Sequence, residues 1–301
     1  MKIEEMLKRI PDLSTRPAVA LETTVLTHGR PYPQNVECAL KCEEEIRRAG
    51  GEPYTIGILN GQVKIGLTKD EIEYLGKTMD AVKVSRRDLP YVIEKGLNGS
   101  TTVAATMILA SLAHIRVFST GGIGGVHRGF NETRDVSADL EEFSKTDVNV
   151  ICAGPKAILD IPRTLEYLET KGIPVIGYKT DKRPLFYTST SKYPLDIHAD
   201  SAKELASILH TSDLLGLKQG SLIVNPVPEK YSLDADRREG KIEEALARRE
   251  KDHVTGKKVT PYLLSKLVGL TKGKSLETNR ALIENNAYVG GLLAKELLNL
   301  K

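Results

Sequence analysis

The sequence contains no tryptophan, and aromatic residues make up only 5% of its 301 positions. Proteins that bind single-stranded nucleic acid stack its bases on aromatic side chains, so this chain has little material for such a platform. The formal net charge is only +3, and basic and acidic residues are interspersed without a dense basic block. A nucleic-acid polymer is therefore not an expected partner, and any cationic feature should be local.

Cysteine is scarce as well. The three cysteines, Cys38, Cys42 and Cys152, cannot form a disulfide framework, and the first two lie four positions apart in a segment with a helical pattern. No apolar run approaches the roughly eighteen residues that a membrane span requires, and none follows the charged first residues as in a secretory signal. We therefore expect an unprocessed cytoplasmic protein that has no membrane partner.

The rest of the composition, 40% hydrophobic and 28% charged, is that of an ordinary soluble protein with room for one large α/β domain or two smaller ones. We predict strands at 18–26, 54–67 (a hairpin around Asn60-Gly61), 81–85, 116–120, 148–153, 173–178, 185–190 and 220–226. We predict helices at 3–10, 35–49, 68–78, 89–96, 101–114, 137–145, 157–171, 201–215, 242–249, 261–270 and 275–300, with a turn-rich loop after the first strand.

Strands therefore alternate with helices over most of the chain, and the last seventy or so residues are helical in pattern. The hairpin makes the sheet mixed. We see no internal repeat and no break in composition that would mark a domain boundary. The prediction is a single domain over 1–301 with an α/β fold: a three-layer α/β/α arrangement, a mixed but mostly parallel central sheet and a helical C-terminal segment.

The stretch 119–139 reads STGGIGGVHRGFNETRDVSAD and combines five glycines with a histidine, arginines, acids and hydroxyls. Glycines let a backbone approach a ligand and present bare N–H groups, and the other side chains offer cationic, anionic and hydroxyl partners. A long exposed loop that happens to be rich in glycine is the alternative. Because long loops in compact domains are usually functional or disordered, we interpret this stretch as a binding loop for a polar, phosphorylated molecule.

Polar or cationic residues appear where three predicted strands stop: Lys83, Thr120 and Lys156. If those strands are neighbours, the three side chains converge on one pocket at the carboxyl edge of the sheet. Two lysines near one anionic ligand can take different roles. One neutralises a phosphate, and the other, once desolvated, attacks a carbonyl or sugar carbon as an amine. Lys156 is the better candidate nucleophile, whereas Lys83 is also explained as a snorkelling residue at a sheet edge.

Acidic residues suggest two further roles. Glu22 interrupts the predicted strand 18–26, where a carboxylate must be paired, protonated or functional. If burial raises its pKa, Glu22 can donate a proton, and a structural carboxylate with satisfied hydrogen bonds is the alternative. Asp135 and Asp139 together could hold Mg²⁺ or Mn²⁺, which need only one or two carboxylates besides water and substrate oxygens. Capping of the following helix is the competing explanation for this spacing.

The last predicted helix contains three asparagines, Asn279, Asn285 and Asn286. Asparagine is a mediocre helix former because its side chain competes for backbone hydrogen bonds. At least one of the three is therefore expected to contact a partner rather than water.

Eight segments, spread in order over nearly the whole chain, form a combination that is specific to one known family: AVALETTVLTHG, KVSRRDLP, TTVAATM, STGGIGGVHRG, DVSADL, ICAGPK, IVNPVPE and SLETNRALIENNA. On these motifs the sequence resembles the pseudouridine-5'-phosphate glycosidases, also known as the indigoidine synthase A-like family. The resemblance implies reversible cleavage of the C–C glycosidic bond of pseudouridine 5'-phosphate to uracil and ribose 5-phosphate, with Mn²⁺ as cofactor. It also implies a homotrimer.

The resemblance assigns roles to individual residues. The nucleophilic lysine, which forms a Schiff base with C1' of the opened ribose, matches Lys156, and the proton donor matches Glu22. The aspartate that binds the metal, mainly through water, matches Asp135. Positions that bind substrate or line the pocket match Lys83, Val103, Thr120, His127, Ser137, Ala138, Asp139 and Asn279.

Two other functions remain open at this point. A class I aldolase or another sugar-phosphate lyase also uses a Schiff-base lysine, and release of uracil separates it from a glycosidase. A non-catalytic sugar-phosphate sensor would keep the pocket and bind without turnover.

Overall fold

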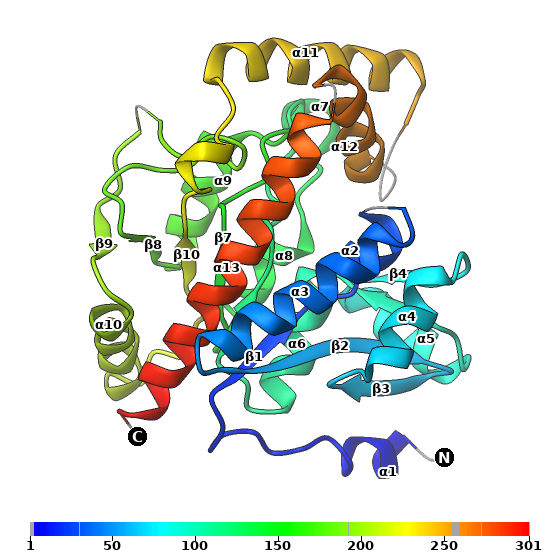
Figure 1. The fold of residues 1–301 in the computed structure, drawn as a ribbon, viewed down its shortest axis with the longest axis vertical. Helices are drawn as coiled ribbons and strands as arrows, with labels where there is room; N and C mark the ends of the chain where they lie inside the picture. Colours follow the sequence, from blue (N-terminus) through cyan, green and yellow to red (C-terminus); the bar gives the residue numbers. More distant parts are fainter. Residues whose placement is uncertain (1–2, 30, 192, 255–258, 272, 301) are drawn as a thin grey trace.

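A computed structural model describes residues 3–29, 31–191, 193–254, 259–271 and 273–300 (Figure 1). Over these residues ten strands form one sheet in the order β4-β5-β2-β1-β6-β7-β10-β8-β9, with β3 paired to β2. The strands are β1 (Ala18–Leu21), β2 (Glu52–Leu59), β3 (Gln62–Ile65), β4 (Val82–Val84), β5 (Gly99–Thr101), β6 (Val117–Ser119), β7 (Asn149–Cys152), β8 (Val175–Tyr178), β9 (Ile197–Ala199) and β10 (Leu222–Val224). Only the pairs of β2 with β3 and with β5 are antiparallel, which confirms the predicted mixed, mostly parallel sheet.

Helices cover the sheet and continue past it. They are α1 (Ile3–Leu7), α2 (Thr24–His28), α3 (Gln34–Arg48), α4 (Lys69–Lys77), α5 (Leu89–Glu94), α6 (Val103–Leu112), α7 (Phe130–Thr133), α8 (Ala138–Glu142), α9 (Ile161–Thr170), α10 (Ala202–Leu214), α11 (Ala235–Lys251), α12 (Val259–Leu270) and α13 (Lys274–Leu298). The side chains of Thr68 and Glu71 form a capping box at the start of α4. None of these helices combines the length and apolar content that crossing a bilayer demands.

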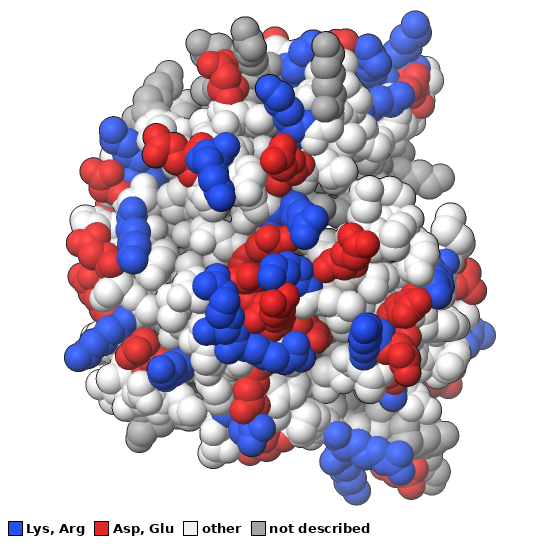
Figure 2. All heavy atoms as spheres, in the orientation of Figure 1, with Lys and Arg blue, Asp and Glu red and all other residues white. Residues whose placement is uncertain are grey.

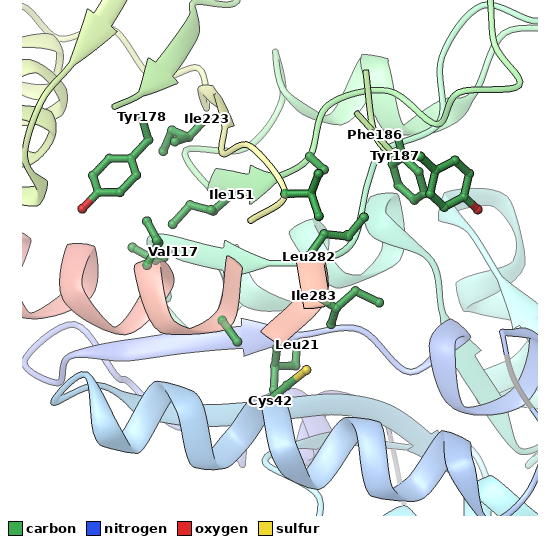
Figure 3. Close-up of a cluster of buried hydrophobic side chains, with 14 of the residues drawn as sticks. Leu21, Cys42, Val117, Ile151, Tyr178, Phe186, Tyr187, Ile223, Leu282 and Ile283 are labelled. Carbon is green, nitrogen blue, oxygen red and sulfur yellow. The ribbon is translucent and has the colours of Figure 1, made fainter. Parts of the chain in front are cut away.

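Side chains of the central strands alternate between two hydrophobic cores, one on each face of the sheet. In β1, Val19 and Leu21 belong to the core shared with α3 and α13, whereas Ala18 and Ala20 belong to the core shared with α6 and α8. Figure 3 shows Leu21 and other strand residues of the first core next to α13 and α3. A sheet buried on both faces needs near-continuous apolar strands. The three-layer α/β/α arrangement is confirmed.

Helix α13 runs diagonally across the molecule (Figure 1) and packs on β1, β6 and β7, beside α3, which packs on β2. Two adjacent glycines permit this close packing. A Cβ at Gly290 would lie 3.2 Å from Val19 Cγ1, and one at Gly291 would lie 2.6 Å from the carbonyl oxygen of Ile46 in α3. The small residues bring the N-terminal half of α13 to the carboxyl ends of the central strands, where α11 and α12 also lie.

Charges of both signs are mixed over the face shown in Figure 2. The band at its centre coincides with α3, where Arg47 pairs with Glu43 and Arg48 pairs with Glu45. Exposed pairs of this kind contribute little to stability. Because each pair combines opposite charges, this face carries no large patch of one sign, as the interspersed charges of the sequence indicate.

The first strand is shorter than the predicted range 18–26. β1 ends at Leu21, and Thr24–His28 form α2, although Thr23, Thr24 and Val25 are β-branched. The hydroxyl of Thr23 donates to the carbonyl oxygen of Ile56 at 2.9 Å, so a side chain holds the neighbouring strand here. The predicted loop after the strand is therefore partly helical, and Glu22 lies just beyond the strand rather than within it.

A predicted strand at 185–190 is wrong. Phe186 has a φ of 60°, and the N–H of Leu185 bonds to the carbonyl of Thr188, so the chain turns. The turn buries the rings of Phe186 and Tyr187, which pack edge to face with centroids 4.7 Å apart. The short strands β5 and β9 and the short helix α7 were not predicted, and the helices predicted at 101–114 and 157–171 begin later than expected, at Val103 and Ile161.

Candidate active site

A cavity of about 170 Å³ lies at the carboxyl ends of β1 and β6, between α2, α12 and α13. Its wall contains five of the residues predicted from the sequence: Glu22, Lys83, Thr120, Lys156 and Asn279. Each comes from a different segment of the chain. The predicted convergence of Lys83, Thr120 and Lys156 on one pocket is confirmed.

The convergence does not arise in the way that the sequence suggested. β6 and β7 are neighbours, but β4 is separated from β6 by β5, β2 and β1. Lys83 therefore reaches the cavity from a distant strand of the same sheet, while Lys156 follows β7 directly.

Glu22 is held by a chain of hydrogen bonds that runs from Asn225, after β10, through Asn286 of α13. Asn225 Nδ2 donates to Asn286 Oδ1 at 2.9 Å, and Asn286 Nδ2 donates to the carbonyl oxygen of Thr120 at 2.8 Å. The hydroxyl of Thr120 then donates to the Glu22 carboxylate. Because the Asn286 side chain is fully buried, this chain fixes the acid from the protein interior.

The prediction that an asparagine of the last helix contacts a partner is confirmed by Asn286. Asn285 also donates to the carbonyl oxygen of Pro226 at 3.3 Å. The sequence drew attention to three asparagines and could not tell which of them supports the acid.

Burial raises the pKa of the Glu22 carboxyl above its ordinary value, and the nearby Asp139 adds to this effect. The positive charges of Lys156 and Lys83 and the hydrogen bond from Thr120 act in the opposite direction without cancelling it. The carboxyl group therefore keeps its proton to higher pH than an exposed glutamate, and it can donate that proton to a bound molecule.

The loop that carries Lys156 is pinned to the glycine-rich stretch. The N–H of Lys156 donates to the carbonyl of Ile123 at 3.1 Å, and the N–H of Ile123 donates to the carbonyl of Gly154 at 3.2 Å. Gly154 has a φ of 87°, which favours glycine at this position. Nearby, burial raises the pKa of the Cys152 thiol to about 12, so this thiol does not compete with the amine as a nucleophile.

Asp139 joins the glycine-rich loop to the start of α6. Its two oxygens accept from the N–H of Ala104 at 2.9 Å and from the N–H of Gly124 at 2.8 Å. A Cβ at Gly124 would lie only 2.2 Å from Ser137 Oγ, so this glycine is required. Both oxygens are engaged with backbone donors, which favours the structural explanation of Asp139 over a metal ligand. Ser137 caps α8 by accepting from the N–H of Asp139.

His127 and Asp135 face each other beside the cavity, with Nδ1 and Oδ2 3.9 Å apart. Burial lowers the pKa of His127, and the charges of Arg249, Lys156 and Lys83 lower it further, while Asp135 raises it. Within the described part of the chain no three histidine, cysteine or acidic side chains gather as a ready metal site. A cation here would need water and substrate oxygens to complete its shell.

The remaining predicted residues lie outside the cavity wall. Val103 and Ala138 are the first residues of α6 and α8. The side chain of Val103 is buried in a hydrophobic core, so this residue can offer a ligand only its backbone, whose N–H at a first helical position has no partner within the helix.

Two parts of the wall were missed by the sequence analysis. His28 lines the cavity from the end of α2, a region predicted as loop. Helix α12 and α13 add an apolar side with Leu264, Val268 and Ile283. The sequence predicted helices at 261–270 and 275–300, but a helical pattern does not say which cavity an apolar face closes.

The chain is similar in sequence and fold to proteins of one family. The family model for "Indigoidine synthase A like protein" matches residues 12–296. A pseudouridine-5'-phosphate glycosidase of Caldanaerobacter subterraneus subsp. tengcongensis is 53% identical over 285 residues, which cover 95% of this chain and 93% of that protein.

Solved structures give the same picture. An indigoidine synthase A-like protein from Thermotoga maritima superposes with a TM-score of 0.88 at 36% identity, covering 95% of this chain and 94% of its own. The prealnumycin C-glycosynthase AlnA, solved in complex with ribulose 5-phosphate, has a TM-score of 0.88 at 35% identity and covers 99% of this chain and 96% of its own. By its sequence motifs, its fold and these matches, the chain belongs to the indigoidine synthase A-like family.

Proposed function

We propose that this chain reversibly cleaves the C–C glycosidic bond of pseudouridine 5'-phosphate, giving uracil and ribose 5-phosphate. The observation that carries the proposal is that Lys156 and a Glu22 with a raised pKa share one cavity. Close relatives named for this activity, and a structural relative that binds a pentose phosphate, support the choice of substrate.

The bond to be broken explains why a lysine is needed. A C–C glycosidic bond has no basic heteroatom in its leaving group, so the usual pair of carboxyl groups acting on a glycosidic oxygen cannot cleave it. An amine bonded to the sugar carbon can stabilise the positive charge that develops on this carbon as the bond breaks, because its lone pair forms an iminium when the leaving group departs.

In the proposed sequence, the neutral amine of Lys156 bonds through Nζ to C1' of the ribose as the C1'–O4' bond breaks, and the proton that Nζ loses passes to O4'. Glu22 then protonates C5 of the uracil ring. The electrons of the C1'–C5 bond restore the C5–C6 double bond of uracil, while the lone pair of Nζ forms the iminium with C1'. Water hydrolyses the iminium, which frees Lys156 and returns the sugar as the aldehyde that closes to ribose 5-phosphate.

The other residues of the site receive supporting roles in this proposal. Lys83 neutralises the phosphate, and Asn279 contacts the bound nucleotide from α13. Thr120 holds Glu22 and, with the main chain of the glycine-rich loop, contacts the ligand. His127, Val103 and the segment from Ser137 to Asp139 complete the substrate site from behind that loop.

Mn²⁺ belongs to the proposal as a cofactor at Asp135. A partly exposed carboxylate beside the imidazole of His127 offers oxygen and nitrogen donors that suit this ion. When bound, the ion would supply positive charge to the substrate phosphate or hydroxyls. A homotrimer in the cytoplasm completes the proposal, and light scattering of the purified chain decides the assembly.

Product analysis with pseudouridine 5'-phosphate tests the function directly. We expect uracil and ribose 5-phosphate in equal amounts, and pseudouridine 5'-phosphate when both are supplied together. Sugar fragments without uracil would instead indicate an aldolase or another lyase. Thermal stabilisation by the nucleotide with no product would indicate a sensor.

Replacing Glu22 with glutamine should change stability in a pH-dependent way. Because burial raises the pKa of Glu22, ionising it at high pH costs folding free energy, and glutamine avoids that cost. We expect Glu22→Gln to melt at a higher temperature than the wild type above the raised pKa, with the difference shrinking as the pH falls towards 4.5. The same variant should lose about 10²–10⁴-fold in kcat through loss of the proton donor.

The exposed Glu94→Gln is the matched control for this experiment. Melting curves recorded from pH 4 to pH 9 check the prediction. A difference between Glu22→Gln and the wild type that stays constant over this range contradicts the proposed burial of a protonated carboxyl.

Asp135→Asn should weaken Mn²⁺ binding, since an amide has no charge to offer the ion. Titration followed by the paramagnetic resonance signal of free Mn²⁺ measures this without turnover, and Asp200→Asn on the exposed surface is the control. Unchanged Mn²⁺ affinity in Asp135→Asn would show that the ion binds elsewhere or not at all.

A further inference from the structure

His28 lines the cavity from the last position of α2. It belongs to the motif AVALETTVLTHG, but none of the roles given above falls on it and the proposed bond-breaking steps do not use it. It lies six residues after Glu22 in the chain and close enough to Lys83 for the lysine charge to influence its ionisation. A histidine in the wall of a catalytic cavity needs an account of which ring nitrogen faces the ligand.

Hydrogen bonds behind the ring decide this question. Ser100 Oγ donates to the carbonyl oxygen of Val82 at 3.4 Å, which uses the only proton of that hydroxyl. Thr27 Oγ1 donates to Ser100 Oγ at 2.7 Å, which uses the proton of Thr27 in turn. Thr27 Oγ1 also lies 2.5 Å from His28 Nδ1, and in this contact it can only accept.

His28 Nδ1 must therefore carry a hydrogen. In the neutral ring the other nitrogen, Nε2, then bears a lone pair and acts as an acceptor. His28 is exposed at the mouth of the cavity, but partial desolvation by its neighbours lowers its pKa, and the charge of Lys83 lowers it further, so the neutral ring dominates at pH 7. The cavity thus presents a fixed, uncharged acceptor next to the cationic side chain of Lys83.

The chemistry of such an acceptor limits what it can bind. A fully ionised phosphate has only acceptor oxygens, which a lone pair on Nε2 repels, so the phosphate belongs to the lysines and not to His28. A neutral donor is required, and a sugar phosphate with an attached base offers two kinds: the hydroxyls of the pentose and the N–H groups of the base.

We propose that His28 is a further substrate-binding residue, whose Nε2 accepts a hydrogen bond from a neutral donor of the bound nucleotide. The inference rests on the proposed function and deepens it. In this proposal the hydrogen bonds from Ser100 through Thr27 to His28 hold the imidazole in the tautomer that the substrate needs.

Two substitutions separate the nitrogens of the ring. The amide of asparagine reaches the position of Nδ1 but leaves that of Nε2 empty, whereas the amide oxygen of glutamine can reach the position of Nε2. We expect His28→Asn to raise the KM for pseudouridine 5'-phosphate by about 3–10-fold, the worth of one neutral hydrogen bond, with little change in kcat. His28→Gln should stay within about twofold of the wild type.

His198→Asn on the exposed edge of β9 is the matched control and should leave both constants unchanged. Thr27→Val removes the acceptor that fixes the tautomer and should raise KM in the same direction as His28→Asn. Melting temperatures of all variants show whether each is folded.

Kinetics in the synthetic direction identify the donor. A higher KM of His28→Asn for ribose 5-phosphate indicates a sugar hydroxyl, and a higher KM for uracil indicates an N–H of the base. Either result supports the proposal.

Unchanged KM values in His28→Asn overturn the inference while the wild type still releases uracil. Equal losses of kcat in the asparagine and glutamine variants overturn it as well, because they would show that His28 transfers a proton rather than accepting a hydrogen bond. A wild-type chain that releases no uracil refutes the proposed function itself, and this inference with it.

Discussion

The hydrogen-bond chain from Asn286 through Thr120 to Glu22 keeps a carboxyl group at the end of β1, where burial raises its pKa. The rest of the site depends on that arrangement, because an acid in water would ionise and could not deliver a proton to a carbon atom. These hydrogen bonds can form only because α13 lies against the sheet. Gly290 and Gly291 allow that approach, since a Cβ at Gly291 would collide with the backbone of α3 and one at Gly290 would press against Val19.

The glycine-rich stretch that follows β6 supports the chemistry rather than performing it. Asp139 ties this loop to the first turn of α6 through two backbone N–H groups, and Ile123 ties it to the loop that carries Lys156. The proposed nucleophile and the proposed acid therefore reach one cavity from the carboxyl ends of β7 and β1, which lie on either side of β6. Fixed geometry of this kind lowers the entropy that a reaction between bound groups would otherwise lose.

Much of this arrangement could be predicted from the sequence, because the central strands are apolar runs that end in polar residues. The positions of Lys156 and Thr120 follow from that pattern alone. The convergence of Lys83 could be expected but not its route, since three strands lie between β4 and β6 and strand order is set by long-range packing. The end of β1 was misplaced because Thr23, Thr24 and Val25 favour strands by their branching, while side-chain hydrogen bonds of Thr23 turn the chain into α2.

Because of that error the sequence analysis did not place His28 at the cavity: the residue fell in a predicted loop, whereas it is the last residue of α2. A second error, at 185–190, came from the same source: aromatic residues favour strands, yet Phe186 and Tyr187 are buried by a turn. In both places local propensity gave way to tertiary contacts. The sequence pattern placed residues correctly where an apolar strand ended in a polar residue, and it failed where a neighbour in space decided the backbone conformation.

Covalent trapping tests the central claim most directly. Borohydride added to the wild-type chain with ribose 5-phosphate reduces an iminium to a stable amine, so the intact mass should rise by one reduced pentose phosphate, and peptide mapping should place the addition on Lys156. Lys156→Ala should show no addition. An active enzyme that keeps its unmodified mass under these conditions, or that carries the sugar on Lys83 instead, would contradict the account.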